Sequence, residues 1–138
     1  MTRRDVTPPG GDPESGSGFA PPTDTLWTLL LADERSLPAV ATILESLPPN
    51  AIARVFAQVA ESHEDTALTS AANFQVTWLR DGGPSSHSRM ADAVRAMRWP
   101  DGPAYVWGRG EACNLVPVQQ YLRDELGLPP ERVDIVPR

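Results

Sequence analysis

The chain has 138 residues and a net charge of −6, and all twelve of its basic residues are Arg. The acidic balance argues against an extended contact surface for nucleic acid or for an anionic membrane. A single Cys excludes a disulfide framework within the chain and a Cys-rich metal site. Because no apolar run approaches the length of a membrane span or of a signal peptide's apolar region, we expect a small cytoplasmic protein.

The first 24 residues differ in composition from the rest of the chain. They hold five Pro and four Gly and very few large apolar side chains. Such a segment cannot bury enough apolar surface to offset the entropy lost on ordering. We therefore expect residues 1–24 to be a disordered leader and residues 25–138 to form one domain.

The domain opens with a strand followed by a helix. Residues 26–32 form a short and almost continuously apolar run, which is typical of a strand buried on both faces. Ser36 is a suitable N-cap and Pro38 is tolerated in the first helical turn. Apolar residues at helical spacing then continue to Leu47, where Pro48 and Pro49 end the helix.

The same alternation continues to the end of the chain. Short runs rich in β-branched and aromatic residues predict strands at 51–60, 74–79, 103–107 and 132–136. Helical spacing predicts helices over 90–97 and 114–126. For the second helix we prefer a start capped by Asn114 to one at Ala112, because it places Pro117 in the tolerated first turn.

Alternating strands and helices predict right-handed βαβ units on a parallel sheet. The fold class is therefore α/β, with a five-stranded doubly wound parallel sheet. Such sheets bind ligands outside the carboxyl ends of their strands. The candidate site is the set of turns that contains Asp33-Glu34, Glu61-Ser62, Arg80-Asp81 and Gly108 to Glu111.

The first of these turns lacks the glycines of a dinucleotide fingerprint. Its backbone cannot approach a pyrophosphate closely, and the carboxylates of Asp33 and Glu34 would repel phosphate. The two acids could instead accept hydrogen bonds from ribose hydroxyls, from amides or from a partner. They could also simply favour the positive N-terminus of the following helix.

Two later turns carry cations. Gly108 and Gly110 permit close backbone approach, and Arg109 between them could pair with a phosphate or point into solvent. Arg80 ends the predicted third strand, where it could meet an adenosine 2′-phosphate or be a solvated strand end.

No residue of the chain forms a recognisable catalytic or metal-binding arrangement. Cys113 has no His or second Cys nearby in the sequence, so we expect it to be a small buried hydrophobe. His63 and His87 lack the spacing of metal ligands.

Four segments of the chain resemble siderophore-interacting proteins, in the same order and at fitting spacing. The first, Ala32-Asp33-Glu34-Arg35-Ser36-Leu37-Pro38-Ala39-Val40, is similar to the "Gly-Asp-Glu-x-x-Leu-Pro-Ala-Ile" segment of that family. The others are Val76-Thr77-Trp78-Leu79, Tyr105-Val106-Trp107-Gly108-Arg109-Gly110-Glu111-Ala112, and the stretch from Tyr121 to Val133.

The resemblance implies both a fold and a chemistry. The family comprises flavin- and NADPH-dependent ferric-siderophore reductases with a flavin-binding barrel and a C-terminal nicotinamide-binding domain. This chain resembles the C-terminal domain alone, which implies NADPH binding, FAD only through a separate flavin-domain partner, and an indirect link to ferric siderophore. The resemblance supports Asp33, Glu34, Arg80, Gly110 and Glu111 as cofactor-binding residues, and the chemistry of the glycine-containing turn adds Gly108 and Arg109.

Several features depart from the family pattern. Ala32 stands where the family usually has Gly, and Arg109 where it has a small residue. The segment 136–138 replaces an aromatic "Tyr-Trp-Arg" ending. Hydride transfer needs a nicotinamide held against an acceptor, so we do not expect this chain to reduce ferric siderophores alone. The alternatives are a redox-inactive interaction module and an accessory domain that binds another phosphorylated small molecule.

Overall fold

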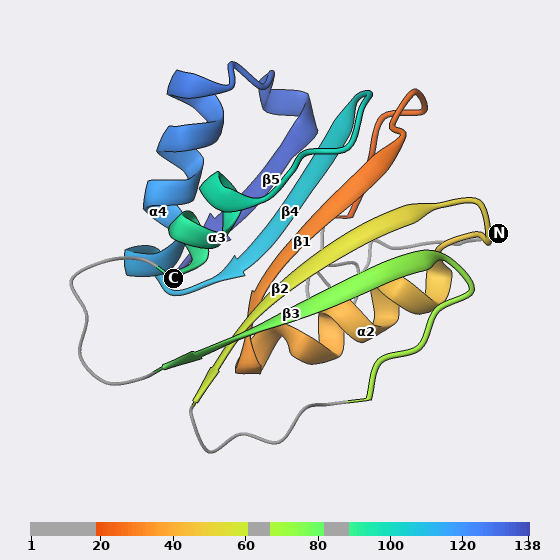
Figure 1. Ribbon diagram of the computed structural model, residues 1–138, viewed down its shortest axis with the longest axis horizontal. Coiled ribbons are helices and arrows are strands. Elements are labelled where there is room, and N and C mark those ends of the chain that lie inside the picture. Colours follow the sequence, from red (N-terminus) through yellow and green to blue (C-terminus); the bar gives the residue numbers. More distant parts are fainter. Residues whose placement is uncertain (1–18, 61–66, 82–88) are drawn as a thin grey trace, which may run out of the picture.

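The computed structural model describes residues 19–60, 67–81 and 89–138 of the chain. Its sheet has five strands in the order β3-β2-β1-β4-β5, and every neighbouring pair is parallel. This arrangement confirms the predicted α/β fold with a five-stranded parallel sheet (Figure 1). The strands are β1 (Trp27–Asp33), β2 (Ile52–Ala60), β3 (Asn73–Asp81), β4 (Ala104–Gly110) and β5 (Val133–Pro137).

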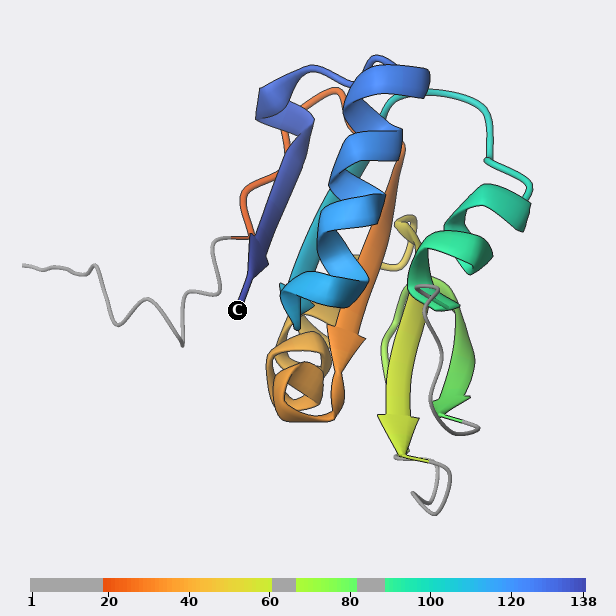
Figure 2. The ribbon, with the colours of Figure 1, turned by 90° about the vertical axis from the view of Figure 1, so that its left-hand side faces the viewer.

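Three α-helices cover the two faces of the sheet. They are α2 (Leu37–Ser46), α3 (Arg89–Ala96) and α4 (Ala112–Gln120). Helix α2 packs on one face, and α3 and α4 pack on the other, which is the doubly wound arrangement (Figure 2). Shorter helical turns are the 3₁₀ turn η1 (Glu34–Ser36), the π turn η2 (Tyr121–Glu125) and the 3₁₀ turn η3 (Pro130–Arg132).

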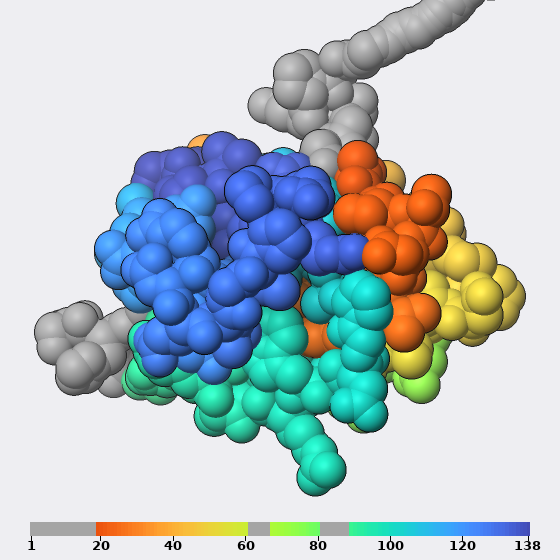
Figure 3. Space-filling model, turned by 90° about the horizontal axis from the view of Figure 1, so that it is seen from above, coloured from red at the N-terminus to blue at the C-terminus, as the bar shows by residue number. Residues whose placement is uncertain are grey.

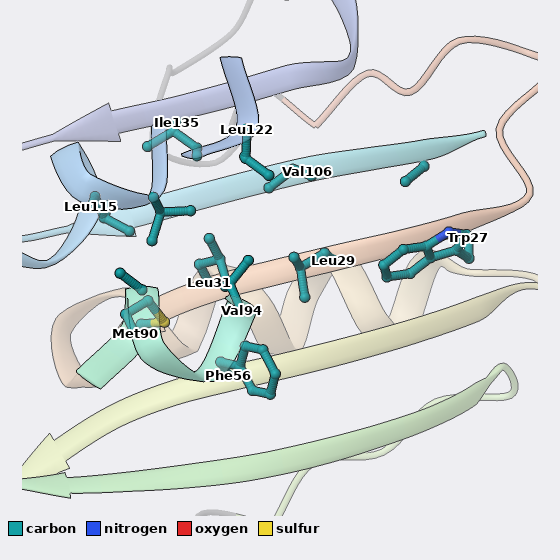
Figure 4. Packing of buried hydrophobic residues seen from close by; sticks show 13 residues of the cluster. Trp27, Leu29, Leu31, Phe56, Met90, Val94, Val106, Leu115, Leu122 and Ile135 are labelled. Atoms are coloured by element: carbon teal, nitrogen blue, oxygen red, sulfur yellow. The ribbon is translucent and has the colours of Figure 1, made fainter. Parts of the chain in front are cut away.

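Strand β1 forms the centre of the core, as its continuous apolar run predicted. Successive side chains of a strand point to opposite faces, so Leu29 and Leu31 join the layer under α3 and α4 (Figure 4). Leu30 and Ala32 join the layer under α2. All four side chains are fully buried. The sheet is therefore held by two separate apolar layers that share β1.

Two strands run further than their composition indicated. We expected 108–111 to be a turn, but Gly108, Arg109 and Gly110 belong to β4 and pair with β5. Likewise, β3 continues through Arg80 and Asp81, which pair with the end of β2. In both cases the hydrogen-bonded partner strand continues, and this pairing outweighs the turn preference of the residues themselves.

Helix α4 starts earlier than predicted, so the preference for Asn114 was wrong. Glu111 is the N-cap, and its carbonyl accepts hydrogen bonds from the amides of Asn114 and Leu115. The first helical amide, that of Ala112, donates to the carbonyl of Arg138 at 3.0 Å. This distant acceptor satisfies one of the amides at the helix start. Pro117 lies inside the helix, where it lacks the N–H that would donate to the carbonyl four residues earlier.

The start of the described chain packs on the domain. The predicted leader spans residues 1–24, of which 1–18 lie outside the described residues. The ring of Phe19 meets that of Tyr105 edge-on at 5.5 Å between centroids. Asp24 pairs with Arg132 at 2.6 Å. We therefore now expect the folded domain to begin at Phe19.

Two truncations test this boundary. We expect removal of residues 1–18 to shift the midpoint of thermal unfolding by no more than a degree or two. Removal of residues 1–24 also deletes the Phe19 and Asp24 contacts, so it should lower the midpoint by roughly 4–8 °C for about 1 kcal/mol lost. Differential scanning calorimetry measures both, and equal midpoints for the two truncated chains would contradict the proposed boundary.

Candidate functional site

The carboxyl ends of all five strands meet at one edge of the sheet, because every pair is parallel (Figure 1). The strand order reverses direction between β1 and β4, and the connections after these strands, α2 and α4, lie on opposite faces. This is the position at which doubly wound sheets bind their ligands. Asp33 ends β1 and Gly110 ends β4, so these two residues flank the candidate site.

Asp33 makes several hydrogen bonds at this position. Its Oδ1 accepts from the amide of Ser36 at 3.1 Å and caps the 3₁₀ turn η1. Ser36 is the N-cap of α2, as predicted, but its side chain makes no cap hydrogen bond. The capping side chain at this helix entry is therefore that of Asp33.

Arg138, which the sequence analysis did not select, lies across the same position. Its Nη1 donates to Asp33 Oδ2 at 2.7 Å, and its Nη2 donates to Asp33 Oδ1 at 3.1 Å and to Ser36 Oγ at 2.8 Å. Its own amide donates to the Gly110 carbonyl at 2.8 Å. The predicted site comprised only turns between a strand and a following helix. Arg138 directly follows the end of β5, so it lay outside that prediction.

The ionisation of Asp33 reflects these contacts. Burial favours the neutral carboxyl, but the hydrogen bonds from Arg138 and Ser36 and the charge of Arg138 outweigh it. The pKa of Asp33 therefore lies below its ordinary value of 3.8. Since the folded state holds the charged form, ionised Asp33 adds stability above pH 3.8, and this contribution is lost as the pH falls through the lowered pKa.

Asp33→Asn should make stability less sensitive to acid. We expect the variant to lose up to about 1 kcal/mol at pH 7, because the ion pair with Arg138 is lost while Asn can still cap the turn. Between pH 5 and about pH 2 it should then lose less of its remaining stability than the wild type does. Urea unfolding across this pH range measures both slopes, and parallel pH profiles for the two proteins would refute the assignment.

Glu34 also bonds within the domain. Its Oε1 accepts a hydrogen bond from the amide of Ala60, the last residue of β2. The carboxylate therefore links the first turn to the end of the neighbouring strand. Glu61 and Ser62, which we expected at the same edge, lie outside the described residues.

The glycines of β4 have different surroundings. A Cβ added to Gly108 would meet Ile135 at 3.2 Å, so this glycine allows β5 to pack closely. A Cβ added to Gly110 would lie 3.8 Å from the Asp33 side chain, which is ordinary contact distance. The Gly110 backbone is thus close to Asp33, and Glu111 next to it is exposed at the start of α4.

Arg109 contacts β5. Its Nη1 donates to the Asp134 carbonyl at 2.8 Å, and its Nη2 pairs with Asp134 Oδ2 at 3.2 Å. The guanidinium also lies 4.7 Å from the centroid of the Trp107 ring. Binding of a pyrophosphate by Arg109 stays a prediction, and it would require the guanidinium to leave Asp134.

Arg80 lies on β3, paired in register with Val59 of β2. It is half-buried near the carboxyl end of the strand. Strand β3 is two positions from β1 in the sheet, which corresponds to about 10 Å at the usual strand spacing. The structure therefore puts Arg80 on the same edge as Asp33 but separate from it.

The remaining candidate residues are the cysteine and the two histidines. Cys113 is exposed, so the expectation of a buried hydrophobe was wrong: it lies on the outer side of α4, whose apolar side faces the sheet through Leu115 and Val118. His63 and His87 are outside the described residues. Within the described ranges, no group of three or more His, Cys, Asp or Glu could hold a metal ion.

The chain is similar to known proteins both in sequence and in structure. The family model of siderophore-interacting proteins matches residues 25–137. An uncharacterized protein of Mycobacterium tuberculosis is 33% identical over 123 residues, which are 82% of this chain and 44% of that protein. The ferric vibriobactin reductase ViuB of Vibrio cholerae is 24% identical over 136 residues, 96% of this chain and 47% of that protein.

A solved structure gives the same result. The crystal structure of a siderophore utilization protein from T. fusca superposes with a TM-score of 0.70 and 29% identity. The match covers 85% of this chain and 45% of that one. The chain thus spans about half the length of the relatives that it matches. In the part of the chain that the structure describes, no helix has the length and apolar character needed to cross a membrane.

Proposed function

Because this chain belongs to the siderophore-interacting protein family, we propose that it binds a reduced nicotinamide dinucleotide, NADPH in preference to NADH, in the reduction of ferric siderophores. The observation that carries the proposal is the reversal of strand order between β1 and β4, with Asp33 and Gly110 at the carboxyl ends of these two strands. The similarity to a ferric vibriobactin reductase supports the link to iron.

The residues at the edge suit different parts of a dinucleotide. Asp33 and Glu34 would accept hydrogen bonds from ribose hydroxyls in exchange for their present partners, and Gly110 lies beside Asp33 with no side chain of its own. The first turn has no glycine and carries two carboxylates, so it suits a ribose better than a pyrophosphate. Recognition of a 2′-phosphate is assigned to Arg80, a half-buried cation near the carboxyl end of β3.

The redox step needs a second component in this proposal. Bound NADPH supplies a hydride, and a flavin is the group that would accept it and pass electrons to the ferric siderophore. We propose that the FAD is carried by a separate flavin-domain protein in the cytoplasm. The residues of this chain then bind and orient the dinucleotide, and none of them is assigned a catalytic role.

Calorimetric titration of the purified chain tests the proposal. We expect binding of NADPH with a dissociation constant in the high micromolar range or weaker, and weaker binding of NADH. Adenosine 2′-monophosphate should compete with NADPH, because it carries the distinguishing phosphate. Absence of heat with NADPH at millimolar concentration would reject the proposed function.

A second candidate is an interaction module without redox chemistry. It is favoured by the self-contacts at the edge, since Asp33, Glu34 and the first amide of α4 already have partners within the chain. A flat titration with both dinucleotides, together with a folded protein by circular dichroism, would favour this alternative.

A further inference from the structure

A polar hollow lies over the amino-terminal and central residues of β2 and β3. It has a volume of about 320 Å³ and is bordered by β2, β3 and the residues after α3. Arg54 is six residues before the carboxyl end of β2, about 20 Å at 3.3 Å per residue, and Thr77 is four residues, about 13 Å, before the end of β3. The hollow is therefore separate from the proposed dinucleotide site.

The sheet register aligns the side chains of this hollow. Arg54 pairs with Gln75, and Phe56 pairs with Thr77, so these four side chains point to the same face of the sheet. Phe56 is buried beneath, while Gln75 and Thr77 are exposed on the edge strand β3. The hollow thus has an apolar floor and hydrogen-bonding groups along one side.

The opposite side is formed by the segment that follows α3. The helix ends at Ala96, and Met97 and Arg98 continue over the same face of the sheet. Figure 3 shows this segment (green to teal) at the surface between α4 (blue) and the chain that enters β2 (yellow). Arg98 is exposed, and it lies across the hollow from β3.

The charge of the hollow contrasts with that of the chain as a whole. The chain carries −6, yet both ionisable side chains that line the hollow are arginines. Within the described ranges, Arg54 donates only to the carbonyl of its neighbour Ala53, and neither Arg54 nor Arg98 forms an ion pair with a carboxylate. Other arginines of the described ranges, such as Arg109, Arg132 and Arg138, do form such pairs.

We propose that this hollow binds a small organic anion with two anionic groups, one held by Arg54 and one by Arg98. Guanidinium groups bind carboxylate and phosphate through paired hydrogen bonds, and two of them favour a ligand with two such groups. Thr77 and Gln75 would donate to its oxygen atoms, and Phe56 and Met97 would contact its carbon skeleton. The volume lies at the small end of ligand pockets, which suits a short molecule.

The test uses two probes on the full chain, succinate as a dicarboxylate and inorganic pyrophosphate as a diphosphate. Heteronuclear NMR titration should give saturable shifts of the backbone amides of residues 54–56, 75–77 and 97–98, with dissociation constants of about 1 mM or below. Amides of residues 33–36 and 110–112 should move much less. The probe that binds more tightly identifies the anionic group.

Substitutions locate the binding groups. The double variant Arg54→Ala, Arg98→Ala should weaken binding at least tenfold, and Arg54→Lys should weaken it several-fold because the paired geometry is lost. Arg123→Ala is the matched control, since Arg123 is an exposed arginine of η2 outside the hollow. The proposal is overturned by linear shifts up to 20 mM for both probes. It is equally overturned by unchanged affinity in a double variant whose spectrum remains that of the folded chain.

Discussion

Arg80→Ala is expected to weaken NADPH binding about ten- to a hundred-fold and NADH binding much less. A charge-assisted hydrogen bond to a phosphate contributes about 1.5–3 kcal/mol, which corresponds to that range in the dissociation constant. Arg80 lies near the carboxyl end of β3, on the edge where the dinucleotide is proposed to bind. Isothermal titration of both cofactors against wild type and variant gives the two ratios.

The control for this prediction is Arg123→Ala. It removes an exposed arginine of η2, which follows the C-terminal end of α4. It should leave the affinity for both cofactors unchanged. If Arg80→Ala weakens NADPH and NADH equally, Arg80 does not distinguish the 2′-phosphate. Such a result would point to a contact with the pyrophosphate that both cofactors share.

Trp107→Ala should cost about 3–5 kcal/mol of the free energy of unfolding. The side chain of Trp107 is fully buried on β4, next to β1 and in the apolar layer under α2. Its removal leaves a cavity that the surrounding strands cannot close, and it also deletes the surface on which Arg109 rests. Because domains of this size have about 5–15 kcal/mol in total, the variant should be barely stable.

Trp78→Ala serves as the comparison, because Trp78 is only partly buried and lies on the edge strand β3. Deleting the same indole there should cost clearly less. Urea unfolding followed by far-ultraviolet circular dichroism gives both free energies. A loss below about 1 kcal/mol for Trp107→Ala would show that this layer repacks.

The fold could be predicted because its signals are local and repeated. Each strand is a short run rich in apolar, β-branched or aromatic residues, and the continuous apolar run of β1 identified the strand that is buried on both faces. The strand ends were less predictable. Gly108 and Gly110 have the composition of a turn, and their place in β4 depends on pairing with residues of β5 that lie 27 positions later.

The candidate site was predictable only in part, because some of its contacts join residues that lie far apart in the sequence. Asp33 and Arg80 could be located because they follow recognisable strands. The role of Arg138 depends on its contacts with Asp33, Ser36 and Gly110. No local sequence pattern encodes these contacts, because the partners lie 28 or more positions earlier in the chain. The predicted start of α4 was wrong because Pro117 is accommodated inside the helix. The acceptor for the first helical amide, the Arg138 carbonyl, is also too distant in the sequence to be foreseen.

The strand order also has a kinetic meaning. Leu30 of β1 pairs with Val55, 25 positions later, and with Trp107, 77 positions later. Closing the longer loop costs about 1 kcal/mol more in chain entropy, so nucleation should start in the half that contains β1, α2 and β2. Strands β4 and β5 would then dock onto a preformed edge of β1 late in folding. Substitutions on β4 should therefore act mainly by accelerating unfolding, with little effect on the rate of refolding.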